Sequence, residues 1–193
     1  MAVYEEQTKG VISLRLFETS ECQAIVQKLM HLETWNQALI REERNGHDYS
    51  DVKNPALRSA TLAQSDDVAW LYREFELRIH QLIKPVVSDL WKIDLKAQSG
   101  TQLLKYEVGD HYKPHLDTGV DLEQRYFSVL CYLNDDFQGG RTLFPTLDYA
   151  VTPVAGQAVL FPSMYRHGSE PITSGRKFVL VSWIDGPVAI KWI

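Results

Sequence analysis

The sequence predicts an α+β fold with a β-sandwich or β-barrel core. Apolar residues recur at helical spacing in the first 100 residues, and after residue 100 they alternate with the two-residue period of strands. Turn residues such as Gly, Asn and Asp separate the later runs, as in domains built from many short strands. The length of 193 residues fits one domain, because domains commonly contain about 100–200 residues.

Composition and charge exclude several classes of protein. The net charge of −5 is not concentrated in any Lys/Arg-rich block, so we expect no nucleic-acid partner. No apolar run is long enough for a membrane-spanning helix, and the N-terminus lacks the hydrophobic core of a signal peptide. The two cysteines form no CxxC motif, which is typical of a reducing compartment. We therefore expect a cytoplasmic protein that binds no membrane. The oligomeric state stays open.

The first predicted elements are a strand and two helices. Alternating apolar residues predict a strand over residues 11–17. Ser20 and Gln23 then form a capping-box pattern at the start of a helix. A longer helix is predicted to be capped by Ser65, and Pro85 should kink or interrupt it near its end.

Residues 41–56 are polar and irregular, and they are too many for a tight turn. Long ordered loops in compact domains are often lids over a site. The sequence therefore predicts a loop over residues 41–56 that is either a lid or a solvated surface loop.

Six apolar runs predict the strands of the core. They lie at about residues 102–108, 126–133, 141–144, 149–154, 157–161 and 176–184. In the last run, Lys177 and Trp183 share one face, and apolar residues occupy both faces. A lysine on such a strand needs an anionic partner, for which a ligand carboxylate is one source, or it reaches solvent from the strand end. Tyr106 points into the core by the same alternation, where its hydroxyl needs a partner such as a ligand or a backbone carbonyl.

Three residues are candidate metal ligands. His115 and Asp117 are two residues apart, so on an extended segment they face the same way, and His167 is the third candidate. Two imidazoles and one carboxylate on one face of a metal leave the opposite positions open. This suits Fe(II) that binds an oxidant and a co-substrate. The His-x-Asp pattern alone also occurs at surface and capping positions. The remaining histidines are interpreted as structural, with His111 as a candidate support for the site: His31, His47, His80 and His111.

Several motifs follow one another with characteristic gaps. They are Tyr106-x-x-Gly109-x-x-Tyr112-x-x-His115-x-Asp117, Gly139-Gly140-Arg141-Thr142-Leu143-Phe144-Pro145, and His167-Gly168-x-x-Pro171-Ile172-x-x-Gly175-x-Lys177, with Trp183 six residues on. In this order they resemble the prolyl 4-hydroxylase-like family of Fe(II)/2-oxoglutarate dioxygenases. The resemblance covers about residues 102–184, and more weakly Leu14–Met30 and Arg58-Ser59.

The resemblance implies a double-stranded β-helix, or cupin-like jelly roll, supported by N-terminal helices. Residues 1–193 would be one dioxygenase domain, with helical support and a lid loop in residues 1–100 and the catalytic core in residues 101–187. His115, Asp117 and His167 match the iron ligands of the family. Lys177 and Tyr106 match the residues that bind the distal carboxylate of 2-oxoglutarate. The presence of Asp117 favours hydroxylation over halogenation, because related halogenases lack the carboxylate ligand.

The implied reaction is hydroxylation of an unactivated aliphatic C–H in an amino-acid, peptide or protein-bound residue, most simply a prolyl one. O2 and 2-oxoglutarate would be co-substrates, succinate and CO2 products, and ascorbate a candidate stimulant. Candidate substrate contacts are Arg58, Tyr112, Arg141 and Trp183, with Arg125 as a further pocket residue. An arginine at the mouth would suit a substrate carboxylate, and hence a free amino acid.

Four other functions stay open at this point. Two use the same iron chemistry, on a small-molecule natural product or on a nucleic-acid base. A zinc hydrolase is the third, although the sequence offers no convincing general base. The fourth is a jelly-roll binding module without turnover.

Overall fold

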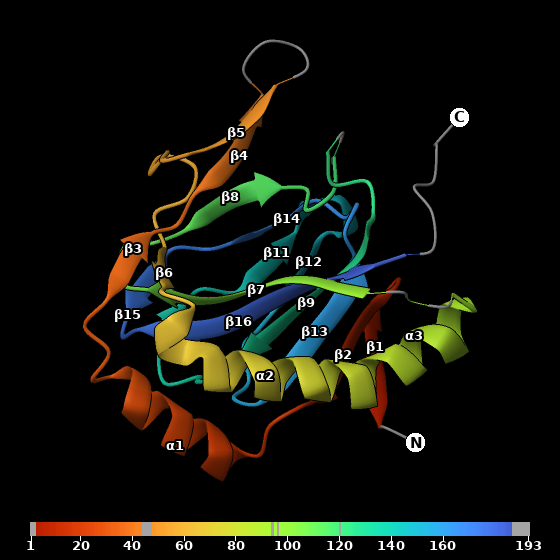
Figure 1. The fold of residues 1–193 in the computed structure, drawn as a ribbon, viewed down its shortest axis with the longest axis horizontal. Coiled ribbons are helices and arrows are strands. Elements are labelled where there is room, and N and C mark those ends of the chain that lie inside the picture. Colours follow the sequence, from red (N-terminus) through yellow and green to blue (C-terminus); the bar gives the residue numbers. More distant parts are fainter. Residues whose placement is uncertain (1–2, 44–47, 94, 96, 120, 187–193) are drawn as a thin grey trace.

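The computed structural model describes residues 3–43, 48–93, 95, 97–119 and 121–186, and it contains two facing β-sheets with helices outside the larger one (Figure 1). The major sheet has the order β1 (Tyr4–Thr8), β2 (Val11–Arg15), β13 (Gln157–Pro162), β9 (Arg125–Tyr132), β16 (Lys177–Asp185), β7 (Ala97–Tyr106), β6 (Thr61–Ala63) and β3 (Trp35–Gln37). The minor sheet has the order β12 (Tyr149–Val151), β11 (Thr142–Phe144), β14 (His167–Ser169) and β8 (Tyr112–His115).

Two further strand pairs complete the architecture. β10 (Gln138–Gly139) pairs with β15 (Ile172–Ser174), and β4 (Ile40–Glu43) pairs with β5 (Tyr49–Val52) in a hairpin that projects from the body of the molecule (Figure 1). The ladders between these strands are antiparallel. The arrangement is the predicted α+β jelly roll, and the fold class is confirmed.

The central strand β16 explains why two apolar cores form. Phe178, Leu180 and Ile184 belong to a core shared with the helices, whereas Val179 and Trp183 belong to a second core between the sheets. Alternate residues of a strand point to opposite faces, so one apolar strand serves both cores. The sequence prediction that this strand is covered on both faces is therefore confirmed.

The helices cover the outer face of the major sheet (Figure 1). They are α1 (Thr19–Leu29), α2 (Ala69–Arg78) and α3 (Lys84–Trp91), with a short 3₁₀ turn over Asp66–Val68. A π-helical turn over Ile79–Ile83 separates α2 from α3 directly before Pro85. Proline lacks the N–H and clashes with the preceding turn, and a widened turn accommodates it. The predicted interruption at Pro85 is confirmed.

Two details of helix capping differ from the prediction. α1 is capped by Glu18, whose backbone N–H donates to the Glu21 carboxylate at 2.7 Å, and not by Ser20 with Gln23. The helix begins one residue before Ser20, so the capping pattern was assigned two residues too late. Ser65 lies at the predicted N-cap position, but its side chain makes no capping hydrogen bond.

The first half of the chain contains more strands than predicted. β1, β3 and β6 extend the edges of the major sheet, although only helices, one strand and a loop were expected there. Strands of three to five residues give too short an alternation to be detected. The irregular loop predicted over residues 41–56 is wrong in its first part, because Arg41 pairs with Asp51 across the β4–β5 hairpin. His47 and the C-terminal residues 188–193 lie outside the described residues. Among the described residues, no helix is long and apolar enough to cross a membrane.

Candidate active site

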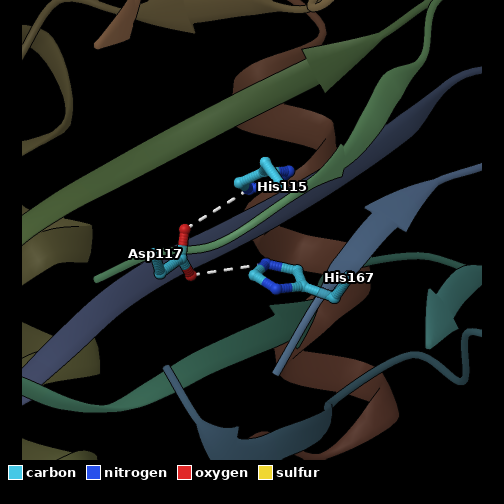
Figure 2. A group of neighbouring side chains, drawn as sticks. All are labelled: His115, Asp117 and His167. Carbon is cyan, nitrogen blue, oxygen red and sulfur yellow. Dashed lines mark ion pairs between the residues drawn. The ribbon is translucent and has the colours of Figure 1, made fainter. Parts of the chain in front are cut away.

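The three predicted metal ligands meet on the inner side of the minor sheet. His115 ends β8 and His167 begins β14, and these two residues are direct partners in the antiparallel ladder. Asp117 follows β8 by two residues, so its side chain returns to the same side as His115. One ligand atom from each residue can be chosen so that all three lie within 4.8 Å of one another. Figure 2 shows the carboxylate of Asp117 facing both imidazoles, with one oxygen directed toward each.

Burial and the neighbouring charges have opposing effects on the pKa values of the triad. The Nε2 atoms of His115 and His167 each lie 3.3 Å from an oxygen of Asp117. Burial alone would raise the pKa of Asp117, but the two imidazoles hold it well below its usual value, so the carboxylate is ionised. Burial lowers the pKa of His115. For His167, burial opposes protonation, but the Asp117 charge outweighs it and raises the pKa.

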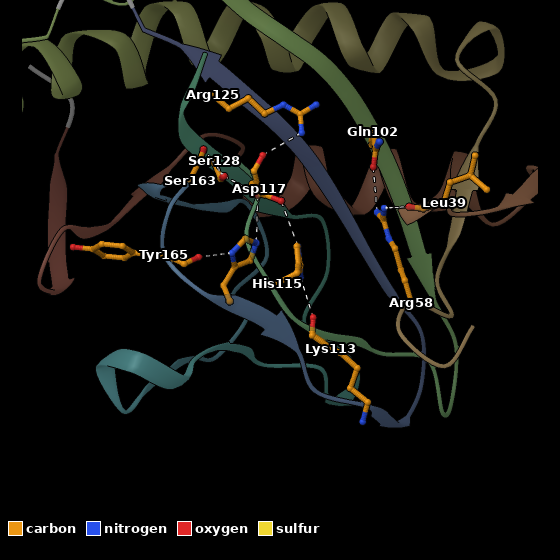
Figure 3. A network of polar contacts seen from close by, with 11 residues as sticks. Leu39, Arg58, Gln102, Lys113, His115, Asp117, Arg125, Ser128, Ser163 and Tyr165 are labelled. Carbon is orange, nitrogen blue, oxygen red and sulfur yellow. Dashed lines mark hydrogen bonds and ion pairs between the residues drawn. The ribbon is translucent and has the colours of Figure 1, made fainter. Parts of the chain in front are cut away.

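Backbone carbonyls fix the orientation of both imidazoles. The Nδ1 atom of His115 lies 2.9 Å from the carbonyl oxygen of Lys113 (Figure 3). The Nδ1 atom of His167 lies 2.9 Å from the carbonyl oxygen of Tyr165. A carbonyl only accepts, so Nδ1 carries the proton and Nε2 keeps its lone pair for a metal. Tyr112 stacks on the His115 ring, with centroids 3.6 Å apart, and holds the ring in place.

Serine hydroxyls support the carboxylate ligand. Ser128 donates to Oδ2 of Asp117 at 2.7 Å and lies 2.9 Å from the hydroxyl of Ser163. The backbone N–H of Asp117 donates to the carbonyl oxygen of Ser163. Ordered partners of this kind are typical around metal ligands. Two imidazole nitrogens and one carboxylate that converge on one point are the donor set suited to Fe(II). The residues present therefore fit an iron centre.

Lys177 supplies a buried positive charge at the start of β16, where it contacts Ser169 of β14. The side chain is 1% exposed, and its ammonium donates to the carbonyl oxygen of Gly140 at 2.7 Å and to the hydroxyl of Ser169 at 3.1 Å. Burial lowers the pKa of Lys177 to about 7. Among the described residues, no carboxylate lies within ion-pair distance of it. A buried ammonium without a counter-ion fits the carboxylate of a bound ligand.

Tyr106 lies beside Lys177 because the two are cross-strand partners in the β7–β16 ladder. The ammonium of Lys177 lies 5.2 Å from the centre of the Tyr106 ring. Burial raises the pKa of Tyr106, partly offset by the nearby Arg58 guanidinium, so the phenol stays protonated and can donate. The predicted pairing of a lysine and a tyrosine at one end of a ligand is thus available in the structure.

One cavity of about 280 Å³ connects the triad to Lys177. Its walls include both sheets and the β4–β5 hairpin, through Ile40, Arg41 and Asp51. Three of the four predicted substrate contacts line this cavity: Arg58, Tyr112 and Trp183. The Arg58 guanidinium lies 4.7 Å from the centre of the Tyr112 ring.

Arg141, the fourth predicted substrate contact, lies outside the cavity. Its guanidinium forms an ion pair with Glu170 at 2.6 Å on the surface. Thr142, the next residue, is buried and lines the cavity, so strand alternation turns Arg141 outward. Arg141 therefore does not line the cavity, and its contact with a substrate stays a prediction.

Several polar residues of the site were not assigned from the sequence. Gln102 lines the cavity and accepts a hydrogen bond from Arg58 at 3.1 Å. It lies two and four residues before Leu104 and Tyr106, so strand alternation could have placed it. Ser128 and Ser163 gave no such signal, because buried serines have no distinctive pattern. His111 instead contacts Ser59 and the backbone of residues 56 and 109, and it does not line the cavity.

Comparison with known proteins agrees with this geometry. Residues 101–185 match the model of the 2OG-Fe(II) oxygenase superfamily. The chain is 32% identical over 135 residues to prolyl 4-hydroxylase subunit alpha-1 of Gallus gallus, covering 60% of this chain and 26% of that protein. It is 28% identical over 200 residues to probable prolyl 4-hydroxylase 9 of Arabidopsis thaliana, covering 87% of this chain and 66% of the relative. The chain thus spans about a quarter to a third of the alpha-1 subunits it matches.

Solved structures with the same fold support the architecture. A Pseudomonas putida prolyl-4-hydroxylase has a TM-score of 0.69 at 18% identity, covering 94% of this chain and 95% of the other. A Trichoplax adhaerens prolyl hydroxylase, in complex with a peptide fragment of the hypoxia inducible factor oxygen degradation domain, has a TM-score of 0.70 at 18% identity, covering 92% and 84%. At this level of identity the two structures establish the shared fold.

Proposed function

We propose that the chain is an Fe(II)- and 2-oxoglutarate-dependent hydroxylase of the prolyl 4-hydroxylase-like kind, because residues 101–185 match the 2OG-Fe(II) oxygenase superfamily model and its relatives and structural neighbours are named prolyl 4-hydroxylases. The reaction converts an aliphatic C–H, 2-oxoglutarate and O2 into the hydroxylated product, succinate and CO2. The observation that carries this proposal is the single cavity that contains both the His115–Asp117–His167 triad and the unpaired ammonium of Lys177. One end suits a metal, and the other suits a carboxylate.

Each residue has a distinct role in the proposal. His115, Asp117 and His167 hold Fe(II), which when bound supplies the O2 activation and the oxidative chemistry. Lys177 and Tyr106 bind the distal carboxylate of 2-oxoglutarate by two charge-assisted hydrogen bonds, one from the ammonium and one from the phenol. This contact fixes the co-substrate in one orientation, with its 2-oxo acid end toward the triad.

The protein further contributes geometry and exclusion of water. Phe144 and Phe161 pack against the His167 ring, with ring centroids 6.2 and 4.6 Å away. These rings keep one side of the triad dry, which strengthens the electrostatic contacts of the site. The backbone carbonyls behind both imidazoles prevent ring rotation while substrate and products exchange.

The β4–β5 hairpin is proposed to act as the lid of the cavity. Its residues Ile40, Arg41 and Asp51 form part of the cavity wall. Arg41 also contacts Asp121, in the segment between Asp117 and β9, with its Nε atom 2.6 Å from the carboxylate. The hairpin is thus held to this segment by a solvent-accessible ion pair, which opens at low energetic cost.

A prolyl-type residue, free or in a peptide or protein, is the proposed substrate. The relatives of this chain are named prolyl hydroxylases, and one solved neighbour holds a peptide fragment. The test is to incubate the protein with Fe(II), 2-oxoglutarate, O2 and either free proline or prolyl peptides. Mass spectrometry should detect a product heavier by one oxygen, in amounts equal to succinate. Absence of succinate under all conditions, with iron bound, would reject the proposal.

Two further properties are proposed for the working enzyme. Ascorbate should stimulate turnover, because an iron site open to O2 needs a reductant after any cycle that oxidises the metal without product. The protein should act in the cytoplasm, a proposal supported by the free and buried thiols of Cys22 and Cys131. Turnover with and without ascorbate, and fractionation of expressing cells, test the two statements.

A further inference from the structure

Another pocket, of about 200 Å³, lies outside the active site, between the end of α3, the start of β9 and the turn after β13. The rings of two of its lining residues, Trp91 and Phe127, are in contact, with centroids 4.9 Å apart. Met164 is 48% exposed, so the lining includes apolar surface that faces water. An apolar pocket that is open to water is a candidate docking site. Its apolar lining consists of Trp91, Ile93, Tyr126, Phe127, Pro162 and Met164.

The described part of the chain ends beside this pocket. Asp185, the last residue of β16, pairs with Arg125 at the start of β9. The backbone N–H of Gly186 then donates to the carbonyl oxygen of Gln124 at 2.9 Å. Gly186 packs so closely on the ring of Tyr126 that a Cβ atom would not fit between them. Because Tyr126 is part of the lining, the chain that follows Gly186 starts at the wall of the pocket.

Residues 187–193, which lie outside the described residues, form an apolar segment. Five of the seven are apolar, and in an extended chain Val188, Ile190 and Trp192 face one side. Seven extended residues reach up to about 25 Å from Gly186, which exceeds the width of a pocket of this volume. A cavity of about 150 Å³ holds a benzene molecule, so this pocket has room for one large side chain of the segment. The segment reads Pro187-Val188-Ala189-Ile190-Lys191-Trp192-Ile193.

The pocket suits the indole of Trp192 in particular. Its lining contains the rings of Trp91 and Phe127, and aromatic rings pack favourably on one another. An indole N–H also needs an acceptor when it is buried. Thr118 lines the same pocket, and its hydroxyl donates to the carbonyl oxygen of Leu122 at 3.0 Å, which leaves its oxygen lone pairs available to accept.

The charges of the segment and of the pocket rim are complementary. Lys191 is the single charged residue of residues 187–193, and in an extended chain it faces away from Trp192. With Trp192 in the pocket, Lys191 therefore points outward, where the lining includes the exposed carboxylate of Glu123. Arg125, the other charged residue of the lining, stacks instead on Trp183 at 3.8 Å from the ring centre.

We propose that residues 188–193 dock into the pocket between α3 and β9 of their own chain, with the Trp192 side chain inside and Lys191 beside Glu123. The chain's own segment is favoured over that of a second copy, because a short tether at the pocket wall gives it a high effective concentration. Arg125 lines both this pocket and the active-site cavity, so the docked segment covers the outer side of a wall of the active site. No residue of the metal triad takes part, and the proposal is independent of the proposed function.

The test uses the trypsin site that Lys191 provides within the segment. The full chain is treated with trypsin at low micromolar concentration, and mass spectrometry follows the initial rate of cleavage after Lys191. A docked segment is cleaved only in its transiently open state, so the rate reports the population of that state. We expect cleavage at least about tenfold slower than in a synthetic peptide that contains residues 187–193.

A pair of variants links the protection to the pocket. Met164→Glu places a charge on the apolar lining, and because the side chain is half-exposed the fold should be retained. Cleavage after Lys191 should then approach the rate in the peptide. Val154→Glu is the matched control, since Val154 is a comparably exposed apolar residue outside the pocket, and its cleavage rate should equal that of the parent. Circular dichroism checks that both variants are folded.

Urea denaturation of a double-mutant cycle gives a second measurement. Trp192→Ala should lower the denaturation midpoint, because the indole no longer fills the pocket. Met164→Glu should lower the midpoint less in the Trp192→Ala background than in the parent, since the contact is already lost. Equal effects of Met164→Glu in the two backgrounds would show that the two residues do not interact, and the proposal would be rejected.

Three results of the trypsin experiment would overturn the proposal. Cleavage of the parent at the rate of the peptide would mean that the segment is not docked. Slow cleavage that persists in Met164→Glu would mean that the segment binds elsewhere on the protein. Protection that appears only as the protein dimerises with increasing concentration, followed by light scattering, would assign the pocket to the segment of a second copy.

Discussion

The two faces of the major sheet are formed by the same strands, but one packs against the helices and the other lines the cavity. On the helix side, Phe178 and Leu180 of β16 pack with apolar residues of α2 and of the turn that follows it. On the inner side, Lys177 and Trp183 of the same strand line the cavity together with the triad. The helix face buries mainly apolar groups, whereas the inner face also buries charges and unsatisfied donors. Stability should therefore depend mainly on one face, and ligand binding on the other.

Asp117→Ala should have the largest effect, and it tests whether the inner face is specialised for binding. Losing the carboxylate removes one of three metal ligands, so hydroxylation should fall by more than about 1,000-fold. Calorimetric titration with Fe(II) under argon measures the loss of metal affinity, and a product assay measures the loss of hydroxylation. The apo-protein should stay folded in circular dichroism. Full activity of this variant would remove Asp117 from the proposed triad.

Leu180→Ala tests the opposite face. The side chain is fully buried in the core shared with the helices, so its truncation should lower the free energy of unfolding by about 2–5 kcal/mol. Urea denaturation measures this change. At temperatures where the variant is folded, its Fe(II) and 2-oxoglutarate affinities should equal those of the parent. A loss of co-substrate affinity comparable to the loss in stability would show that the two faces are not separable.

Lys177→Met sharpens the comparison because this residue belongs to the same strand but to the inner face. The KM for 2-oxoglutarate should rise about 10- to 100-fold, since a carboxylate loses its charged partner. The apo-protein should not be destabilised near neutral pH, because methionine fills similar volume without a buried charge. A variant with unchanged 2-oxoglutarate dependence would move the carboxylate site elsewhere, with Arg176 as the neighbouring candidate.

The pH dependence of apo-protein stability gives an independent check on Lys177. Burial lowers its pKa to about 7 in the folded chain, against 10.5 as the ordinary value. Between these two values the unfolded chain binds a proton that the folded chain does not, so this residue makes stability rise with pH. The parent should therefore gain stability relative to Lys177→Met as pH rises from about 7 toward 10.5. Parallel stability curves for the two proteins would contradict a buried, unpaired lysine.

Arg41→Gln should have the smallest effect. It removes the exposed contacts of the β4–β5 hairpin with Asp51 and Asp121. The KM for the substrate that undergoes hydroxylation should change less than about fivefold, because exposed ion pairs contribute little to conformational stability. Fe(II) binding should not change. If iron affinity falls as much as substrate affinity, the hairpin is scaffold and not a lid.

The sequence predicted the long central strand and the site residues on it because β16 is a nine-residue strand with clear alternation. Alternation placed Lys177 and Trp183 together on the inner face, as observed. It could not reveal that β8 and β14 are paired strands, since they contain only four and three residues. Their pairing brings His115 and His167 together, and only the resemblance to a family suggested it.

The sequence predictions that differ from the structure share one physical cause. Local sequence patterns carry no information about tertiary contacts. The polar residues 41–43 and 49–52 were interpreted as loop, because a hairpin that projects from the molecule lacks an apolar face. Arg141 was assigned to the pocket by its place in a motif, although Thr142 is the residue whose side chain points inward. Partners such as Ser128 and Ser163 are defined only by tertiary contacts, so no sequence pattern identifies them.

The most direct test of the central claim is an anaerobic titration of the apo-protein with Fe(II) and then 2-oxoglutarate, followed by visible absorption. If the triad and Lys177 serve one cavity, a weak charge-transfer band of an iron-bound 2-oxo acid should appear. The band should vanish in His167→Ala, and Lys177→Met should require about 10- to 100-fold more 2-oxoglutarate to produce it. A folded protein that binds Fe(II) but shows no band at any 2-oxoglutarate concentration would contradict the account and favour a jelly-roll binding module.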